Sequence, residues 1–327
     1  MDFVTTVSGN EPIAITIGNF DGIHRGHQRL LHELGAVARS LGCKPVMVTF
    51  SPHTLLVVRP AIQLDCLTTL EEKLALAKEY GQVADNIVIH FTQEVAAMTA
   101  SAFLDELRAH FRIQAMVIGN NFSLGHNRMG DVAFLQQYGQ DHQILILPVE
   151  LEAVERTRIS STRIRSYVSE GQITAANELL GHPVVASGIV VKGDQRGRLL
   201  GFPTANLLPE AHKLLPANGV YAALVYTDNA RESDAIDQIP VSYDDQQNRW
   251  NSVVNIGVRP TFGGQQETGR LVEAHLLDVQ LDLYDQRITI NFISRLRNEQ
   301  RFNGIDALKA QIAADAQQAR LLLQKGG

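Results

Sequence analysis

The chain has 327 residues, of which 45% are hydrophobic and 20% charged, and its formal net charge is −6. That length is comfortable for two domains, and the composition is that of a folded globular protein. Neither half is basic and no apolar run approaches the ~20 residues of a membrane span, so we expect neither a nucleic-acid partner nor a membrane protein. Cys43 and Cys66 lack metal-ligand spacing and the first residues lack a signal-peptide pattern, which together indicate the reducing cytoplasm.

The first clear element is an apolar, β-branched run at residues 13–17, which is typical of a buried parallel strand. Residues 28–38 carry leucines at helical spacing, so residues 18–27 form a strand-to-helix turn with the sequence G-N-F-D-G-I-H-R-G-H. Free backbone N–H groups and the helix dipole favour an anion at such a turn. His24 and His27 lie three apart and share a helix face. The turn therefore suits nucleotidyl transfer, in which fixed donors stabilise charge on a phosphate; a capped turn with two solvated histidines is the alternative.

This turn resembles the HxGH signature of the nucleotidyltransferase superfamily. With G-N-F-D-G in front, it is similar to the adenylyltransferase half of the bacterial bifunctional riboflavin kinase/FAD synthetase family. The resemblance implies that His24 and His27 stabilise the transition state of adenylyl transfer from ATP. It also implies that the nucleotide is bound by three further residues of the turn, Gly18, Phe20 and Gly26.

The rest of the first half alternates strands with helices. Thr69 and Glu72 have the spacing of a capping box at the start of one helix, and an amphipathic helix begins at Ser101. This alternation predicts an α/β domain with a doubly wound parallel sheet. Its further strands are expected at 44–50, 87–91, 115–119 and 143–149.

Two polar turns follow strands of this half. Residues 51–53 are S-P-H where the resembled family has F-x-P-H-P, and Thr54 replaces the last proline. His53 either faces the nucleotide phosphates or caps the turn. The loop 119–131 is similar to the family's G-x-D-F-x-F-G segment, which lines the nucleotide and flavin. Asn121 stands where that pattern has Asp, and we expect its amide to bind a ribose or base; a plain surface turn is the alternative.

A hydroxyl-rich segment follows the last of these strands. Residues 158–165 read R-I-S-S-T-R-I-R, and Ser160 or Ser161 is a natural N-cap. Hydroxyls and arginines at a helix start bind phosphate and draw charge off a departing pyrophosphate, although alone they are common in an ordinary cap. The segment is similar to the I-S-S-T-x-I-R segment of FAD synthetases. That resemblance implies that Ser161, Thr162 and Arg165 engage the leaving phosphates.

The pattern changes near residue 182, where short β-rich runs separated by Gly, Pro and Asn replace the strand–helix alternation. We therefore place a domain boundary there. The resemblance implies an adenylyltransferase domain at 1–181 and a riboflavin kinase domain at 182–327. The second half predicts a small antiparallel β-barrel followed by a helix at 305–323. Residues 227–251 are polar and acidic and are interpreted as an inserted loop without assigned chemistry. The barrel strands are expected at 184–192, 220–226, 253–256, 271–277 and 287–292.

A flexible cationic loop opens the second half and is fit to cover a polyphosphate. After it, Thr204 and Asn206 lie two apart, so on an extended segment their oxygens point to one side, and hard neutral oxygens beside a triphosphate suit Mg²⁺. A Thr-x-Asn pair alone is more often a capped turn. The whole segment, however, closely resembles the G-x-G-R-x-L-G-F-P-T-A-N-L signature of riboflavin kinases. The resemblance implies that Thr204 and Asn206 hold Mg²⁺ and that the phosphates are bound by Lys192, Gly193 and Gly197.

One strand of the second half carries a glutamate. Alternation places Glu273, His275 and Leu277 on one face of the strand, opposite Val272 and its alternate neighbours. A glutamate there is suited to accept a hydroxyl proton for attack on a γ-phosphate, whereas an isolated strand glutamate usually faces solvent. The segment is similar to the family's V-E-x-H-x-x-D segment, which implies that Glu273 is the catalytic base. Residues 254–262 resemble the family loop near the flavin and are given no individual roles.

Motifs in both halves follow the family pattern in order. The resemblance implies a cytoplasmic two-domain enzyme that converts riboflavin and ATP to FMN, and then FMN and ATP to FAD and pyrophosphate. Two alternatives remain: a riboflavin kinase whose adenylyltransferase half is weak or silent because of Asn121, and a non-catalytic flavin-binding protein that keeps the scaffolds. The sequence carries no signal for the oligomeric state.

Overall fold

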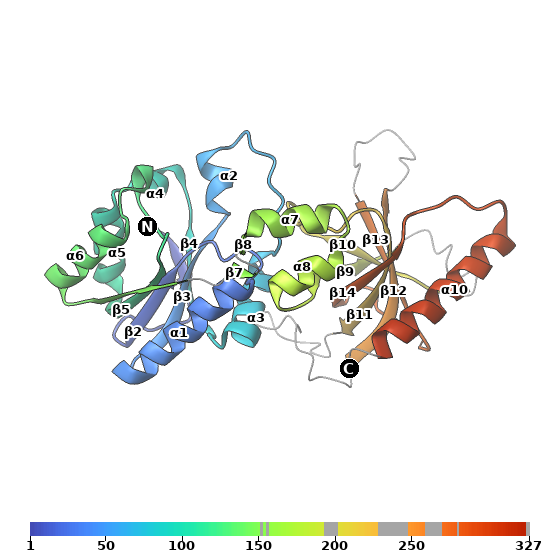
Figure 1. Cartoon of the computed structure of the whole chain (residues 1–327), viewed down its shortest axis with the longest axis horizontal. Helices are drawn as coiled ribbons and strands as arrows, with labels where there is room; N and C mark the ends of the chain where they lie inside the picture. The colour runs from blue at the N-terminus through green and yellow to red at the C-terminus, as the bar shows by residue number, and fades with distance from the viewer. Residues whose placement is uncertain are drawn as a thin grey trace. The chain divides into compact units, whose positions relative to one another are not determined.

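The computed structural model describes residues 1–150, 153–154, 157–192, 202–227, 248–258, 270–279 and 281–324. The chain divides into two compact units, each treated separately below (Figure 1). The first unit is Met1–Cys66 with Lys73–Ser160, and the second is Leu67–Glu72 with Ser161–Gly327. None of the described helices has the length and hydropathy that a transmembrane segment requires.

The first unit is built on a six-stranded sheet with the order β1-β4-β3-β2-β5-β6. All neighbouring strands pair in parallel except β1, which pairs antiparallel with β4 at the edge. The predicted doubly wound parallel sheet and its five strands are confirmed, whereas β1 was missed because three residues are too short to show a period. The strands are β1 Phe3–Thr5, β2 Pro12–Ile17, β3 Lys44–Ser51, β4 Asp85–His90, β5 Arg112–Gly119 and β6 Leu145–Val149.

Helices cover both faces of this sheet. One face packs against α5 and α6, and their Phe103, Leu107 and Leu135 share a buried cluster with Ile13 and Ile15 of β2. The opposite face packs against α1, which contacts β2, β3 and β5. The bounds are α1 Arg25–Leu41, α2 Thr54–Val58, α3 Leu70–Gly81, α4 Gln93–Ala97, α5 Ala100–His110, the 3₁₀ turn η1 His126–Arg128, and α6 Val132–His142; a hairpin joins β7 Ala153–Val154 to β8 Thr157–Arg158.

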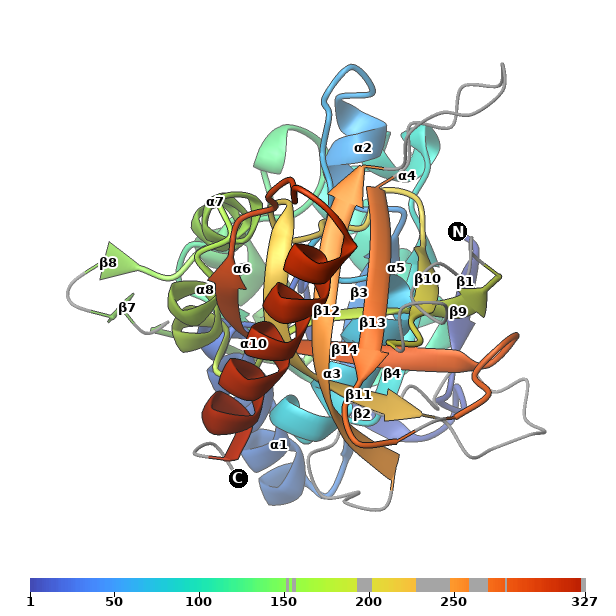
Figure 2. The same ribbon diagram turned by 90° about the vertical axis from the view of Figure 1, so that its right-hand side faces the viewer.

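The second unit contains a closed antiparallel barrel with the strand order β10-β13-β12-β11-β14-β9. This confirms the predicted barrel, and the C-terminal helix α10 packs on its outside through Ala316 and Ala319 against Val220 and Ala222 (Figure 2). The helices α7 and α8 group with this unit, whereas the sequence placed them in the first domain; the functional boundary near residue 182 stays a prediction. The bounds are α7 Ser161–Ser169, α8 Ile173–Leu180, β9 Val184–Val191, β10 Ala205–Pro209, β11 Gly219–Thr227, β12 Arg249–Val258, β13 Arg270–Leu276, β14 Arg287–Arg297 and α10 Ile305–Gln324.

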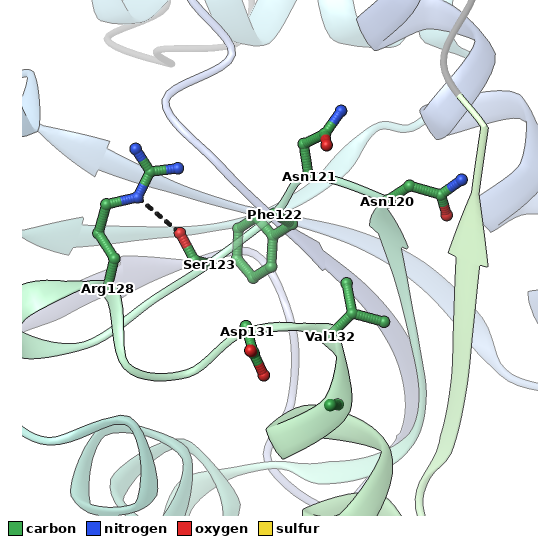
Figure 3. Close-up of a pocket in the computed structure, with 8 residues that line it drawn as sticks. Asn120, Asn121, Phe122, Ser123, Arg128, Asp131 and Val132 are labelled. Carbon is green, nitrogen blue, oxygen red and sulfur yellow. Dashed lines mark hydrogen bonds between the residues drawn. The ribbon is translucent and has the colours of Figure 1, made fainter.

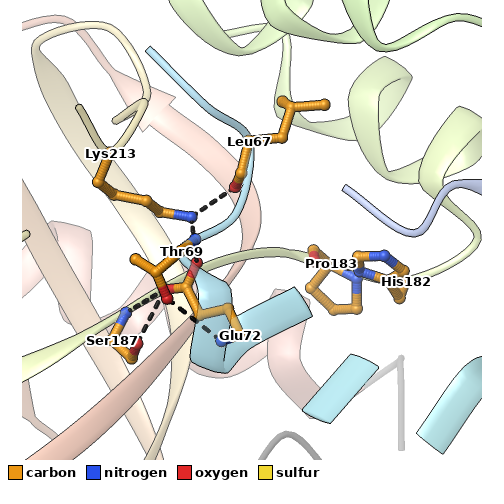
Figure 4. A network of polar contacts seen from close by, with 7 residues as sticks. All are labelled: Leu67, Thr69, Glu72, His182, Pro183, Ser187 and Lys213. Atoms are coloured by element: carbon orange, nitrogen blue, oxygen red, sulfur yellow. Dashed lines mark hydrogen bonds and ion pairs between the residues drawn. The ribbon is translucent and has the colours of Figure 1, made fainter. Parts of the chain in front are cut away.

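A buried ion pair ties the segment Leu67–Glu72 to the barrel (Figure 4). The capping box is confirmed: Thr69 N–H donates to Glu72 Oε2 at 3.0 Å, and Glu72 N–H donates to Thr69 Oγ1 at 3.2 Å. The same carboxylate accepts bonds from the backbone and hydroxyl of Ser187 in β9 and from Lys213 Nζ at 2.6 Å. The ion pair is completely buried, and Lys213 also donates to the Leu67 carbonyl. Every charge in this cluster therefore has a partner.

We expect Lys213→Met to destabilise the protein by about 3–5 kcal/mol, because it leaves the Glu72 carboxylate buried without its counter-charge. Urea unfolding measures the loss, with Lys309→Met on the exposed side of α10 as the matched control. Adding Glu72→Gln to Lys213→Met should recover part of the stability. A loss below 1 kcal/mol for the single variant would contradict this assignment.

Candidate functional site

The turn between β2 and α1 is held in an unusual backbone conformation. Phe20 and Ile23 have positive φ angles of 51° and 38°, and Gly22 between them has φ 85°. A left-handed backbone conformation at a residue other than glycine lowers stability by on the order of 1–3 kcal/mol. It persists only where the surrounding packing holds it in place. Packing does so here, since Phe20 and Ile23 are buried, at 2% and 0% exposure. The residues of the turn are therefore fixed before any ligand arrives.

The two histidines of the turn lie in contact. Their rings stack with centroids 3.6 Å apart and planes 14° from parallel. His24 is also the N-cap of α1, because its Nδ1 accepts a hydrogen bond from the His27 N–H at 3.3 Å. Gly26 makes room for this arrangement, since a Cβ there would lie 3.3 Å from the His24 ring. The structure thus brings His24, His27 and Gly26 together as predicted, with His24 Nδ1 in its unprotonated, accepting form.

His27 is a weak base in this setting. Burial lowers its pKa well below 6.5, and the nearby His24 and Lys73 lower it further. Its Nδ1 is buried and has no hydrogen-bond partner among the residues that the structure describes. The imidazole is therefore neutral near pH 7, and a ring N–H remains available to a charge that develops beside it.

The start of α2, just after β3, is bonded directly to this turn. Asn19 donates through Nδ2 to Thr54 Oγ1 at 2.9 Å and accepts from the Thr54 N–H at 3.2 Å. A proline at position 54 would have neither the backbone N–H nor the hydroxyl that bond to Asn19. Thr54 therefore adds two hydrogen bonds between the two loops. His53 caps α2, because its Nδ1 accepts from the Leu55 N–H at 3.2 Å. Capping is thus observed for His53, and its contact with phosphate stays a prediction.

The loop after β5 forms an open pocket of about 390 Å³ (Figure 3). Asn121 lines it, and its role as a binding residue stays a prediction. Asp131, which also lines the pocket, caps α6 by accepting from the Phe134 N–H. Arg128 donates to Ser123 Oγ at 2.7 Å and adds a positive charge to the wall. Arg128 was given no role from the sequence, although a cation inside a Gly/Asn loop is a usable signal. The lining residues are Asn120, Asn121, Phe122, Ser123, Arg128, Asp131, Val132 and Ala133.

Helix α7 begins at Ser161, so the predicted helix start is confirmed. Ser161, Thr162 and Arg165 occupy its first turns, and Ile164 is buried beneath them. These residues belong to the second unit and the histidines to the first, so their joint action on one ATP molecule stays a prediction.

Strand register places two of the predicted kinase residues, Asn206 and Glu273, on one face of the barrel wall. Glu273 of β13 pairs directly with Asn206 of β10 on one side and with Asn255 of β12 on the other. Directly paired residues point to the same side of a sheet, and the alternate residues Val272 and Ala274 are fully buried inside. Asn206, Glu273 and Asn255 therefore form a row on the outer face. Asn255 had no predicted role, because no local sequence pattern reports the register of β12 against β13.

The segment before β10 is held against the same strand. His275 Nδ1 is 2.8 Å from the Pro203 carbonyl oxygen, and the His275 ring meets the Phe202 ring edge-on. Thr204 follows directly and comes immediately before β10, two positions from Asn206, and its role as a metal ligand stays a prediction. Lys192 is exposed, with its ammonium 5.9 Å from the centroid of the Tyr284 ring. The predicted residues Gly193 and Gly197, and residues 228–247 and 259–262, lie outside the described residues.

Comparisons with known proteins match both halves of the chain. A family model described as FAD synthetase matches residues 7–163, and one described as riboflavin kinase matches residues 180–323. A bifunctional riboflavin kinase/FMN adenylyltransferase of Escherichia coli (strain K12) is 37% identical over 95% of this chain and 92% of its own. One of Pseudomonas fluorescens is 34% identical over 94% of this chain and 92% of its own.

A solved structure shows the same architecture over nearly the whole chain. It is a crystal structure of a Streptococcus pneumoniae protein named a macrolide-efflux protein. The TM-score is 0.80 at 26% identity, and the match covers 96% of each chain.

Proposed function

Because the chain belongs to the family of bifunctional riboflavin kinase/FMN adenylyltransferases, we propose that the two residue clusters described above carry out its two reactions. The enzyme phosphorylates riboflavin with ATP to FMN, and then transfers AMP from ATP to FMN, which gives FAD and pyrophosphate. Two separate clusters suit these two successive reactions, because the nucleophile attacks a different phosphorus atom of ATP in each.

The adenylyl transfer is assigned to residues 1–181. A phosphate oxygen of FMN attacks the α-phosphorus of ATP, the bond to the β-phosphate oxygen breaks, and pyrophosphate leaves. His24 and His27 stabilise the negative charge that builds on the equatorial oxygens by donating ring N–H groups. His24 is oriented for this because its Nδ1 is occupied as the helix cap, which leaves its proton on Nε2. Ser161, Thr162 and Arg165 engage the departing pyrophosphate.

The riboflavin phosphorylation is assigned to residues 182–327. Glu273 accepts the proton of the terminal ribityl hydroxyl, whose oxygen attacks the γ-phosphorus of ATP while ADP leaves. The direct pairing of Asn206 with Glu273 carries this assignment, because it sets a hard oxygen ligand next to the base. Thr204 and Asn206 offer the neutral oxygens that fit Mg²⁺, which supplies charge neutralisation on the phosphates when bound.

The thiols and the net charge of this enzyme bear on its cellular compartment and on its type of substrate. Cys43 and Cys66 are partly accessible thiols that form no disulfide, as is usual in a reducing compartment. The net charge of −6 favours small-molecule substrates over nucleic acid. We therefore place the protein in the cytoplasm, acting on riboflavin, FMN and ATP.

A substitution at the proposed Mg²⁺ ligand tests the kinase assignment. We expect Asn206→Ala to raise the Mg²⁺ concentration that gives half-maximal riboflavin phosphorylation by at least about tenfold, since even outer partners of metal sites contribute 10–100-fold to affinity. The measurement is a Mg²⁺ titration of FMN formation, with the exposed Asn298→Ala as the matched control. FMN adenylylation by the same variant should keep its wild-type Mg²⁺ dependence. An unchanged titration of FMN formation would remove Asn206 from the metal site.

A further inference from the structure

A buried lysine lies near the turn that carries the two histidines. Lys73, near the start of α3, is 6% exposed, and its ammonium points to the carboxyl end of β3. It donates to Thr49 Oγ1 at 3.2 Å and to the Phe50 carbonyl at 3.4 Å. Thr49 in turn donates to the carbonyl of Asn19 in the turn, at 3.3 Å. Lys73 is therefore connected to the loop that carries His24 and His27.

The partners of this ammonium are unusual for a buried charge. Both of its hydrogen-bond acceptors are uncharged, although a buried lysine is normally paired with a carboxylate. The same chain shows the ordinary arrangement at Lys213, whose ammonium lies 2.6 Å from the Glu72 carboxylate. Lys73 thus differs from Lys213 in that its described hydrogen bonds go to uncharged oxygens, although the carboxylate of Asp21 acts on its charge.

The charged groups near Lys73 affect its pKa. Burial lowers the pKa of Lys73 from 10.5 to about 8, while Asp21 and Cys66 act in the opposite direction. The ammonium is close enough to His27 to lower the pKa of that imidazole. Because His27 is neutral near pH 7, the ammonium of Lys73 provides a positive charge at this edge of the sheet, and it attracts a phosphate bound there.

We propose that Lys73 is a phosphate-binding residue of the adenylyl-transfer site, where its ammonium contacts a phosphoryl oxygen of ATP or of FMN. This rests on the assignment of His24 and His27 to that site. The four-carbon stem lets the ammonium leave its two neutral acceptors for a phosphate oxygen without moving the backbone. A charged donor fixed beside a phosphate stabilises the bound substrate and the charge that develops during transfer.

The test compares Lys73→Met and Lys73→Arg with Lys78→Met, an exposed lysine of the same helix. We expect Lys73→Met to lower kcat/KM for FAD formation from FMN and ATP by about 100-fold, with riboflavin phosphorylation unchanged. Lys78→Met should keep both activities. A raised KM for ATP would place the ammonium on the ATP phosphates, and a raised KM for FMN would place it on the FMN phosphate. Adenylylation by Lys73→Met within twofold of the wild type would overturn the proposal.

The pH dependence separates phosphate binding from a structural role. The titratable groups that face Lys73 are Asp21, Cys66 and His27, and β3 contributes only neutral groups. The protonated ammonium is the active form, so wild-type kcat/KM for adenylylation should fall as the pH rises through about 8. In Lys73→Arg this fall in kcat/KM should occur at higher pH, because a guanidinium stays protonated. If kcat/KM of Lys73→Arg fell at the same pH as that of the wild type, the proposal would be overturned, even if Lys73→Met folds poorly.

FAD formation by two variants distinguishes a wrong role for Lys73 from a wrong assignment of the site. If His24→Ala keeps FAD formation, the assignment of the site is wrong whatever Lys73 does. If His24→Ala loses FAD formation while Lys73→Met keeps it, only the role of Lys73 is wrong.

Discussion

Replacing His24 with alanine should lower FAD formation from FMN and ATP by about 100- to 1,000-fold and leave riboflavin phosphorylation unchanged. In the proposed mechanism the imidazole donates to the charge that builds on the α-phosphate. Its position is set by stacking on His27 and by capping α1. Because the same chain performs both reactions, its FMN formation reports directly on whether the variant is folded. The measurement is the initial rate of each step, followed by chromatographic separation of the flavins.

A second variant separates the chemistry of His24 from its capping role. His24→Ser retains a side-chain acceptor at the N-cap and so keeps most of the stability that an alanine there would lose, about 1 kcal/mol. We expect it to lose FAD formation as fully as His24→Ala. His32→Ala, an exposed histidine on the same helix, should be silent. If His24→Ser restored FAD formation, the histidine would be a cap and not a catalytic group.

Replacing Glu273 with glutamine should lower riboflavin phosphorylation by about 100- to 10,000-fold, because glutamine cannot accept the hydroxyl proton. The side chain lies on the outer face of β13, away from the barrel interior, and glutamine has nearly the same shape, so the barrel should fold normally. FMN supplied from outside should still be converted to FAD at the wild-type rate. Initial rates of FMN formation and of FAD formation measure the two effects.

Asp282→Asn provides the control for Glu273→Gln, since it neutralises an exposed carboxylate of the same unit. It should leave both rates unchanged. Riboflavin phosphorylation by Glu273→Gln within tenfold of the wild type would mean that another group takes the proton. Loss of both reactions in a folded Glu273→Gln variant would contradict two independent sites.

The sequence predicts those features whose signal is local. The strand at 13–17, the helix after it and the capping box of Thr69 and Glu72 each depend on neighbours within a few positions, and the structure confirms them. The alternation around Glu273 is confirmed for the same reason. The edge strand β1 was missed because it is too short to show a period.

The missed features depend on contacts between distant positions. Asn255 joins Glu273 and Asn206 only through the register of three strands. Lys73 reaches the histidine turn across β3, and the bond between Ser187 and Glu72 spans 115 positions. No local pattern reports such pairings, so the residues that complete the sites emerge only from the fold.

The most direct test of two reactions in one chain is a time course of the flavins. The purified protein is incubated with riboflavin, excess ATP and Mg²⁺, and the flavins are separated at intervals. FMN should rise first and then fall as FAD appears, and supplied FMN should give FAD without a lag. FMN that accumulates without FAD, even when FMN is supplied directly, would contradict an active adenylyltransferase half and direct attention to Asn121 and its loop. Riboflavin recovered unchanged would contradict the kinase assignment.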